Sequence, residues 1–156
     1  REIKIEDGEI LVGGETLCLG YWQEDGIRSV VDQQGWLHTG DLGSIDTDGR
    51  LTVTGRRDNM FISGGENIYP AELERVLADF DGLTEFAIVG RDDPRWGQVP
   101  VVVAARSGPT VTGDAVLAHF EGRIARFKRP KDVVFVEALP RNALGKVVAA
   151  EVRALL

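Results

Sequence analysis

Hydrophobic and polar residues change their spacing about a third of the way along the chain. Before that point, short apolar or alternating runs are separated by frequent glycines, and residues 9–12 (EILV) are typical of a short β-strand. An Asp48-Gly49 pair between residues 43–47 and 51–55 is typical of a β-hairpin turn. Residues 1–56 are therefore predicted to be β-rich and to form the end of a larger domain.

Helical periodicity begins at Pro70, a residue that suits the first turn of a helix. Apolar residues at i, i+3, i+4 and i+7 then predict a buried helix face before Gly82: Leu73, Val76, Leu77 and Phe80. Thr112 suits the cap of a second helix. The buried face of that helix would be Val116, Leu117, Phe120 and Ile124. A third helix is predicted over residues 147–155.

Apolar and β-branched runs in this second region predict strands. They cover residues 58–63, 83–89, 99–106 and 132–136. Pro100 lacks an amide donor, which favours an edge position for the strand that contains it. Residues 57–156 are therefore predicted to form a compact α+β domain of about 100 residues.

Composition and charge argue against several classes of protein. A net charge of −7 does not suit a protein that binds nucleic acid or anionic membranes. The single cysteine, Cys18, forms no internal disulfide, so a cytoplasmic location is expected. The longest apolar run, residues 99–105, is too short to span a membrane, and no signal peptide opens the chain. Because the chain begins with Arg1, we expect it to be a fragment of a longer protein.

The first motif that suggests chemistry is GWLHTGDLG, residues 35–43. Asp41 is flanked by glycines and is predicted to lie on a loop at the end of a strand. Its ionised carboxylate offers only acceptors, and the two adjacent hydroxyls of a ribose are a matching pair of donors. An aspartate that bonds to its own turn is the alternative, and for this motif taken alone it is the stronger explanation.

The second motif, GRRDNMFISGGENIYPAELE at residues 55–74, places a glycine pair before the first helix. Gly64 and Gly65 leave backbone that can approach a ligand closely and adopt positive φ. A plain loop before a helix also explains the pair. The neighbouring charges Arg56, Arg57 and Asp58 are equally explained as solvated surface groups.

The third motif, RIARFKRPK at residues 123–131, has five cations in nine positions. We expect Pro130 to end a helix here, so that the cations cluster at its end around Phe127. Cations that bind phosphates, with an aromatic ring on which a base stacks, would make an anion site. A solvated helix face and cations that stabilise the helix dipole are the alternatives.

The fourth motif is LPRNALGK, residues 139–146. Pro140, Asn142 and Gly145 predict a mobile loop that ends in one exposed lysine, Lys146. A single loop lysine usually contributes only to solubility, so the meaning of this motif depends on the other three.

In this order and spacing, the motifs resemble the adenylate-forming superfamily of acyl-CoA synthetases, peptide-synthetase adenylation domains and luciferases. The resemblance covers essentially the whole chain, and DDPRWGQ (residues 92–98) and FKRPK (residues 127–131) are most similar to aryl- and fatty-acid–CoA ligases. It implies that residues 1–56 end the large N-terminal AMP-binding domain with β-rich strands. It also implies that residues 57–156 form the small mobile C-terminal domain, a small mixed sheet flanked by helices. After Lys146 many relatives have a basic helix, whereas this chain reads KVVAAEVRALL.

The resemblance implies a role for each matching residue. At the ATP or AMP site, Asp41 would hold the ribose hydroxyls, with Arg56 beside it and Asn67 facing the nucleotide or acyl group. Asp58 would be the hinge, and Lys146 the catalytic lysine of adenylation. CoA would contact Gly64 and Gly65 along its pantetheine arm, and Trp96, Phe127, Arg129 and Lys131 at its nucleotide.

The implied activity is that of an acid–CoA ligase, in which a carboxylic acid and ATP with Mg²⁺ form acyl-AMP and the CoA thiol then displaces AMP. No protein-bound metal is expected, and the chain alone should be inactive because the family's phosphate loop lies in the missing N-terminal domain. An adenylation domain that delivers to a carrier protein and a non-catalytic module that binds a nucleotide or a partner are the alternatives. The acid stays open, as does the oligomeric state, monomer or homo-oligomer.

Overall fold

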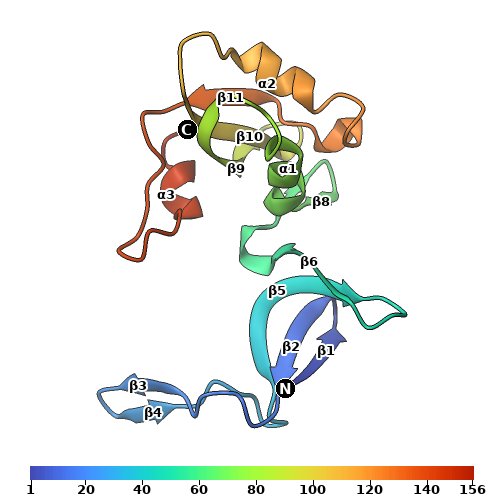
Figure 1. Cartoon of the computed structure of the whole chain (residues 1–156), viewed down its shortest axis with the longest axis vertical. Helices are drawn as coiled ribbons and strands as arrows, with labels where there is room; N and C mark the ends of the chain where they lie inside the picture. Colours follow the sequence, from blue (N-terminus) through green and yellow to red (C-terminus); the bar gives the residue numbers. More distant parts are fainter. The chain divides into compact units, whose positions relative to one another are not determined.

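The computed structural model describes all 156 residues and divides them into two compact units, Arg1–Asp58 and Asn59–Leu156 (Figure 1). The division falls two residues after the boundary predicted from the sequence pattern. All the α-helices lie in the second unit, whereas the first is built from strands. The two units are described separately below.

The first unit is a four-stranded antiparallel sheet with the order β1-β2-β5-β6, together with a separate hairpin, β3-β4. The strands are β1 (Glu2–Glu6), β2 (Glu9–Gly13), β3 (Tyr21–Gln23), β4 (Gly26–Arg28), β5 (Leu37–Ile45) and β6 (Leu51–Arg56). Strands β5 and β6 are the hairpin predicted around Asp48-Gly49, and Gly49 has the positive φ (+79°) that suits its turn.

Strand β5 is irregular where it lies beside β2. From Glu9 to Leu11, β2 advances by two residues, whereas the paired residues of β5 run from Leu42 to His38, a distance of four. Strand β5 therefore carries a bulge of two extra residues. Asp41 was expected on a loop at a strand end, and this expectation is wrong, because it lies inside β5. Glycine and polar residues at the bulge hide the strand periodicity, so the predicted strand began six residues too late.

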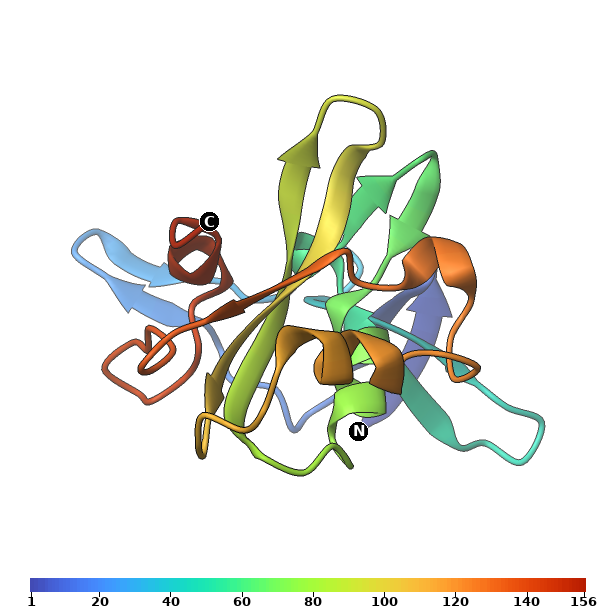
Figure 2. The same cartoon turned by 90° about the horizontal axis from the view of Figure 1, so that it is seen from above.

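The second unit is a mixed sheet with helices on both faces, which confirms the predicted α+β class (Figure 2). Its central strand is β10 (Gly97–Arg106), which pairs antiparallel with β9, parallel with β11 and at one end with β7. The other strands are β7 (Phe61–Ser63), β8 (Glu66–Ile68), β9 (Leu83–Asp93) and β11 (Asp132–Phe135). The helices are α1 (Pro70–Leu77), α2 (Gly113–His119) and α3 (Ala149–Arg153), and two 3-10 turns are η1 (Arg57–Asn59) and η2 (Arg126–Lys128).

Alternate side chains of β10 belong to two cores, as expected for a strand buried on both faces. Val102 and Ala104 face α1 and α2 in one core, which also contains Phe61, Ile68, Leu73, Leu77, Ile88, Val116 and Phe120. Val103 faces α3 in the other, with Ala87, Val89, Leu139 and Val152. The continuous apolar run in the sequence thus reflects a strand covered on both sides.

The edge position expected for the strand containing Pro100 is wrong, because β10 has neighbours on both sides. The Pro100 carbonyl accepts the Lys131 N–H (2.8 Å), one residue before the β10-β11 ladder begins at Val101. The nitrogen and carbonyl of one strand residue point to the same side. The missing N–H therefore falls at the end of the ladder, where no bond is lost.

All three helices are shorter than the sequence predicts, and none is long and apolar enough to cross a membrane. Helix α1 starts at Pro70 as expected but ends at Leu77, and Phe80 lies in the following turn. Thr112 caps α2 as predicted, with Oγ1 accepting the Ala115 N–H (3.2 Å). The apolar periodicity continued past the helix ends because residues in the following turns also enter the core.

The outer edge of β9 is protected by a carboxylate from α1. Glu74 Oε1 accepts the Ile88 N–H at 3.0 Å, so this amide is satisfied without a further strand. Burial raises the pKa of Glu74, and the bond from the Ile88 amide partly offsets that effect. Helix α1 therefore gives the edge strand a hydrogen-bond acceptor as well as apolar packing.

Truncation of Phe120, whose side chain is fully buried between α1, α2 and the sheet, should destabilise the second unit strongly. We expect Phe120→Ala to lower the free energy of unfolding by about 3–5 kcal/mol, measured by native-state hydrogen exchange of the β10 amides. Leu144→Ala is the matched control, because Leu144 is 82% exposed and should change stability by less than about 0.5 kcal/mol. Equal effects of the two changes would contradict this description of the core.

Candidate functional site

In the first unit, the predicted nucleotide residues Asp41 and Arg56 lie directly opposite each other on β5 and β6. Arg56 Nη1 donates to Asp41 Oδ1 at 3.1 Å, and Arg56 Nη2 lies 3.7 Å from Asp58 Oδ2. One guanidinium therefore joins the predicted ribose ligand to the predicted hinge residue. All three side chains are at least partly exposed and accessible to a ligand.

The backbone before Asp41 is held in a tight, hydrogen-bonded bulge. Gly40 has φ +73°, and its N–H donates to Glu9 Oε1 at 2.8 Å. Thr39 Oγ1 donates to the Ile10 carbonyl (2.7 Å) and accepts the Asp41 N–H (3.0 Å). The position of Asp41 thus depends on both its neighbours and on strand β2.

Glu9 was not among the predicted site residues, yet it is the centre of a charged cluster next to this bulge. It is only 5% exposed, and its Oε2 lies 3.1 Å from His38 Nδ1 and 3.5 Å from Arg57 Nη2. The bond to His38 holds the pKa of Glu9 below its ordinary value in spite of burial. The only sequence signal for Glu9 is that a glutamate begins an otherwise apolar strand. An exposed residue at the end of the strand explains that pattern equally well.

His38 lies between two carboxylates. Its Nδ1 faces Glu9 and its Nε2 lies 3.3 Å from Asp32 Oδ2, and these bonds raise the pKa of His38. Backbone N–H groups of Trp36 and Gln34 are the main reason that the pKa of Asp32 is lowered. Two acceptors on opposite ring nitrogens favour the doubly protonated imidazolium.

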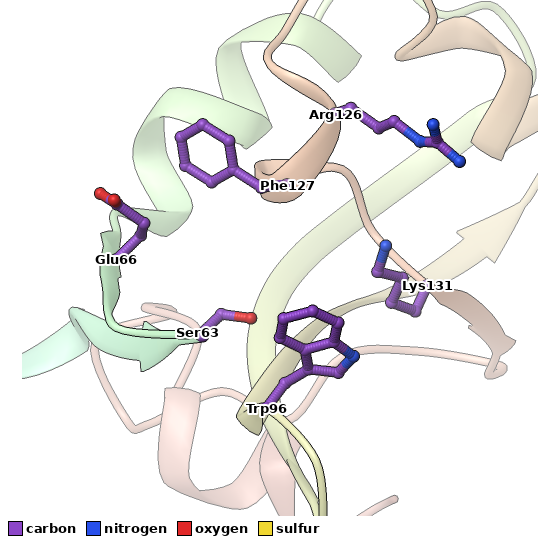
Figure 3. Close-up of a pocket in the computed structure, with 7 residues that line it drawn as sticks. Ser63, Glu66, Trp96, Arg126, Phe127 and Lys131 are labelled. Atoms are coloured by element: carbon purple, nitrogen blue, oxygen red, sulfur yellow. The ribbon is translucent and has the colours of Figure 1, made fainter.

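The second unit contains a pocket of about 460 Å³ between the β7-β8 hairpin, the β9-β10 turn and the segment from η2 to β11 (Figure 3). Trp96 and Phe127 lie on opposite sides of it, with Lys131 beside Trp96. Its lining is Ser63, Gly64, Glu66, Trp96, Arg126, Phe127 and Lys131. The structure therefore brings together four of the predicted CoA residues, Gly64, Trp96, Phe127 and Lys131.

The close contact with Trp96 requires a glycine at position 64. Its N–H donates to the Trp96 carbonyl (2.8 Å), its φ is +60°, and a Cβ would lie 2.8 Å from the indole ring. Gly65 also has a positive φ (+88°) but has open space around its α-carbon and does not line the pocket. Asp93 Oδ1 accepts the Trp96 N–H (2.9 Å), which fixes the other side of the turn.

The expectation that the five cations cluster at a helix end is wrong, because α2 ends at His119. The cations follow on a turn, on η2 and in the loop before β11. Arg123 pairs with Asp79 (3.3 Å), and Lys128 pairs with Glu72 through both carboxylate oxygens (2.9 and 2.7 Å).

The remaining cations of this segment line hollows in the surface. Arg126 and Lys131 line the pocket. Arg129, predicted to contact CoA, instead lines an adjoining hollow of about 280 Å³ that Arg126 and Lys131 share. Arg126 was not predicted, because sequence spacing alone does not separate pocket cations from paired ones.

Lys146 lies at the end of a hydrogen-bonded turn, within the loop that the sequence predicts. Asn142 Oδ1 accepts the Leu144 and Lys146 N–H groups (both 3.0 Å), and the Asn142 N–H donates to the Lys146 carbonyl (2.9 Å). Gly145 provides a positive φ of +77°. Lys146 itself is exposed. The turn thus presents a single ammonium group from an ordered backbone.

The base of this turn is anchored to β9 by Glu85. Its Oε1 accepts the Leu139 N–H (2.7 Å) and its Oε2 accepts from Arg141 Nη2 (2.5 Å). The Arg141 bond, followed by the Leu139 bond, lowers the pKa of Glu85. Within the second unit, the segment containing the turn lies on the opposite side from η2 (Figures 1 and 2). The predicted catalytic lysine and the predicted CoA residues therefore belong to different faces.

Two further expectations concern Asn67 and the binding of a metal ion. Asn67 is exposed on β8, where it pairs with Ile62, and it does not line the pocket. No group of three or more histidine, cysteine, aspartate or glutamate side chains is arranged to hold a metal ion.

Comparison with known proteins identifies the class to which these features belong. Residues 72–146 match the family described as the AMP-binding enzyme C-terminal domain. The chain is 50% identical over 150 residues to the indoleacetate–CoA ligase of Aromatoleum aromaticum, and 45% identical over 151 residues to a 2-succinylbenzoate–CoA ligase of Bacillus cereus. Residues 72–146 therefore belong to the AMP-binding enzyme C-terminal domain family, and over 96% of its length the chain is similar to CoA ligases, as the motifs predicted.

Solved structures agree with this assignment. The o-succinylbenzoate CoA synthetase of Bacillus subtilis, in complex with its acyl-adenylate intermediate, matches with a TM-score of 0.86 and 37% identity over 97% of this chain. ATP-bound MatB from Rhodopseudomonas palustris matches with a TM-score of 0.80 and 36% identity over 95% of this chain. The chain spans 29–33% of the length of these relatives.

The anchoring of the Lys146 turn by Glu85 should depend on pH. Because the folded pKa of Glu85 is lowered, its stabilising effect is present above its ordinary value of 4.5 and is lost as pH falls through the folded pKa. We expect NMR relaxation to show residues 139–147 becoming more mobile as the pH falls from neutral to about 3. Glu85→Gln should make the same residues mobile already at neutral pH.

Glu137→Gln is the matched control, since it removes one exposed carboxylate from the neighbouring segment. It should leave the turn as ordered as in the original chain. A turn that stays ordered in Glu85→Gln at neutral pH would show that Asn142 and Gly145 hold it without Glu85.

Proposed function

We propose that the chain is the C-terminal part of an AMP-forming acid–CoA ligase, which converts a carboxylic acid, ATP and CoA into an acyl-CoA through an acyl-adenylate. The observation that carries the proposal is the pocket of the second unit, where a glycine, two aromatic rings and two cations meet in a chain of the adenylate-forming family. Relatives of this chain are named CoA ligases, and one related structure is described in complex with ATP and magnesium. The single cysteine, which can form no internal disulfide, supports a cytoplasmic enzyme.

Adenylation would use both the Asp41–Arg56 pair and Lys146. The Asp41 carboxylate would accept hydrogen bonds from ribose hydroxyls, while Arg56, which donates to Asp41, would stabilise it and bind phosphate. A carboxylate and the α-phosphate repel each other by about 1 kcal/mol at 4 Å in water and by several-fold more in a drier site. The Lys146 ammonium would offset this repulsion by bridging acyl and phosphate oxygens.

Magnesium would bind through ATP and not through this chain. The chain has no cluster of metal-ligating side chains, whereas Mg²⁺ prefers phosphate oxygens and water. When bound, the ion neutralises phosphate charge. The residues of the chain would position the nucleotide and the acyl group, and Lys146 would add its own positive charge to that of the ion.

Thioester formation would use the pocket. Gly64 and its positive φ let the backbone approach a narrow pantetheine arm, and the Trp96 ring covers the other side of that glycine. Phe127 and Trp96 offer faces on which an adenine can stack. Arg126 and Lys131, which line the same pocket, would bind the phosphates of that nucleotide, and Arg129 extends this cationic surface into the next hollow.

The two half-reactions need different faces of the second unit, and Asp58 offers the means to exchange them. Asp58 is the last residue of the first unit, in the 3-10 turn η1, and Arg56 is its ion-pair partner. Hinge residues absorb a backbone change without contacting substrate. Rotation about Asp58 would present the Lys146 turn for adenylation and the pocket for thioester formation.

Removal of the lysine ammonium should affect only one half-reaction. In the complete ligase, Lys146→Ala should lower the rate of acyl-adenylate formation by about 10²–10³-fold, because a charge that stabilises the transition state is lost. Pyrophosphate release measures this step. Thioester formation from pre-formed acyl-adenylate and CoA should change by less than about threefold.

Lys4→Ala, which removes an ammonium from strand β1, is the matched control and should leave both steps unchanged. The 156-residue chain alone should release no pyrophosphate. A Lys146→Ala enzyme with normal adenylation would overturn the catalytic assignment, and loss of both steps to the same extent would overturn the hinge.

The pocket cations should determine the affinity for CoA. Lys131→Ala or Arg126→Ala in the complete ligase should raise KM for CoA by about tenfold or more, because each removes a charge-assisted contact to phosphate. KM for ATP should not change. Arg123→Ala is the matched control, because Arg123 pairs with Asp79 and lies outside the pocket.

This measurement also separates the alternatives. A carrier protein brings its own pantetheine, so an adenylation domain that delivers to a carrier needs no nucleotide pocket for CoA. If free CoA were not a substrate and a carrier protein were, the pocket would have a different occupant. If no acyl-adenylate formed with any carboxylic acid, the chain would be a non-catalytic binding module.

A further inference from the structure

Glu9 combines burial, charge and three partners in a way that packing alone does not require. Strands β1 and β2 place Glu9 directly opposite Glu6, yet Glu6 is exposed whereas Glu9 is 5% exposed. A buried carboxylate is costly unless hydrogen bonds and opposite charges compensate for its lost hydration. Gly40, His38 and Arg57 provide this compensation.

The bond to Gly40 takes the place of a missing strand pair. The two extra residues of β5 interrupt its ladder with β2 beside this point. Glu9 Oε1 accepts the Gly40 N–H at 2.8 Å, so a side chain of β2 replaces the backbone acceptor that the ladder no longer provides. The residue that follows Gly40 is Asp41, which would hold the ribose.

The second carboxylate oxygen of Glu9 binds the segment that precedes the proposed hinge. Glu9 Oε2 lies 3.5 Å from Arg57 Nη2, and Arg57 precedes the proposed hinge residue Asp58. The preceding arginine, Arg56, points instead to Asp41 and Asp58. Successive arginines therefore tie the end of β6 to β2 and to β5 through separate ion pairs.

We propose that Glu9 is a positioning residue of the ligase, whose buried carboxylate holds the Asp41 bulge and the segment before the hinge in one fixed arrangement. This inference rests on the proposed function. Glu9 touches no reacting atom in it and acts through Gly40 and Arg57. His38 supports the charge of Glu9 from one side, and Asp32 in turn faces His38.

The first test is structural and needs only the 156-residue chain. Glu9→Ala removes the acceptor for Gly40, so hydrogen exchange at the Gly40 amide should accelerate by about tenfold or more relative to amides in the regular β1-β2 ladder. Glu9→Gln keeps a side-chain oxygen and should accelerate Gly40 exchange less. Glu6→Gln removes the same charge from the opposite position and should change nothing at Gly40.

The second test uses kinetics of the complete ligase. Displacement of Asp41 should raise KM for ATP in Glu9→Ala by about tenfold, with Glu9→Gln intermediate and KM for CoA unchanged. A residue with a merely structural role would lower the amount of active enzyme, and hence kcat, without moving KM for ATP. Circular dichroism at the assay temperature confirms that each variant is folded.

The outcomes distinguish this inference from the proposed function. An original enzyme with no ATP-dependent ligation would refute the proposed function, while the exchange measurement would still test whether Glu9 holds Gly40. An active enzyme whose Glu9→Ala variant keeps its KM for ATP, or unchanged exchange at Gly40, would overturn the positioning role of Glu9.

Discussion

The structure depends on one constraint, that a backbone N–H shielded from water needs an acceptor even where no strand ladder supplies one. Three glutamates supply that acceptor at three such places. Glu9 accepts from Gly40 in the β5 bulge, Glu74 from Ile88 on the edge of β9, and Glu85 from Leu139 at the base of the Lys146 turn. Each bond links separate segments of one unit, so the irregular segments that carry the candidate chemistry become as well defined as the sheets.

These bonds explain why the fold was easier to predict than the exact ends of its elements. Apolar periodicity reports burial, and it correctly indicated α1, β9, β10 and the α+β class. It does not report where a helix ends, because Phe80 and Phe120 enter the core from the turns that follow α1 and α2. The rule that proline favours an edge strand fails at Pro100, where the lost donor is harmless because the β10-β11 ladder starts one residue later.

Candidate site residues could be predicted where the residue type alone suggests the role. They could not be predicted where the role depends on which side chain the residue contacts in the fold. Asp41, Gly64, Trp96 and Lys146 have side chains or backbone freedom that a motif can reveal. The pairing of Lys128 with Glu72 and the position of Arg126 in the pocket depend on how η2 packs, so sequence spacing could not separate them. The same reason hid Glu9, whose three partners come from distant positions in the chain.

The proposed two-step chemistry gives these fixed segments a purpose. If one domain presents a lysine turn and later a coenzyme pocket, each must be preorganised, because a loop that orders only in the reacting complex loses binding energy to its own entropy. Glu85 and Asn142 order the Lys146 turn, and the Gly64–Trp96 contact orders the pocket. Flexibility can then be confined to the residues around Asp58, where the two units divide. The carboxylate bonds therefore make a moving domain compatible with precisely placed groups.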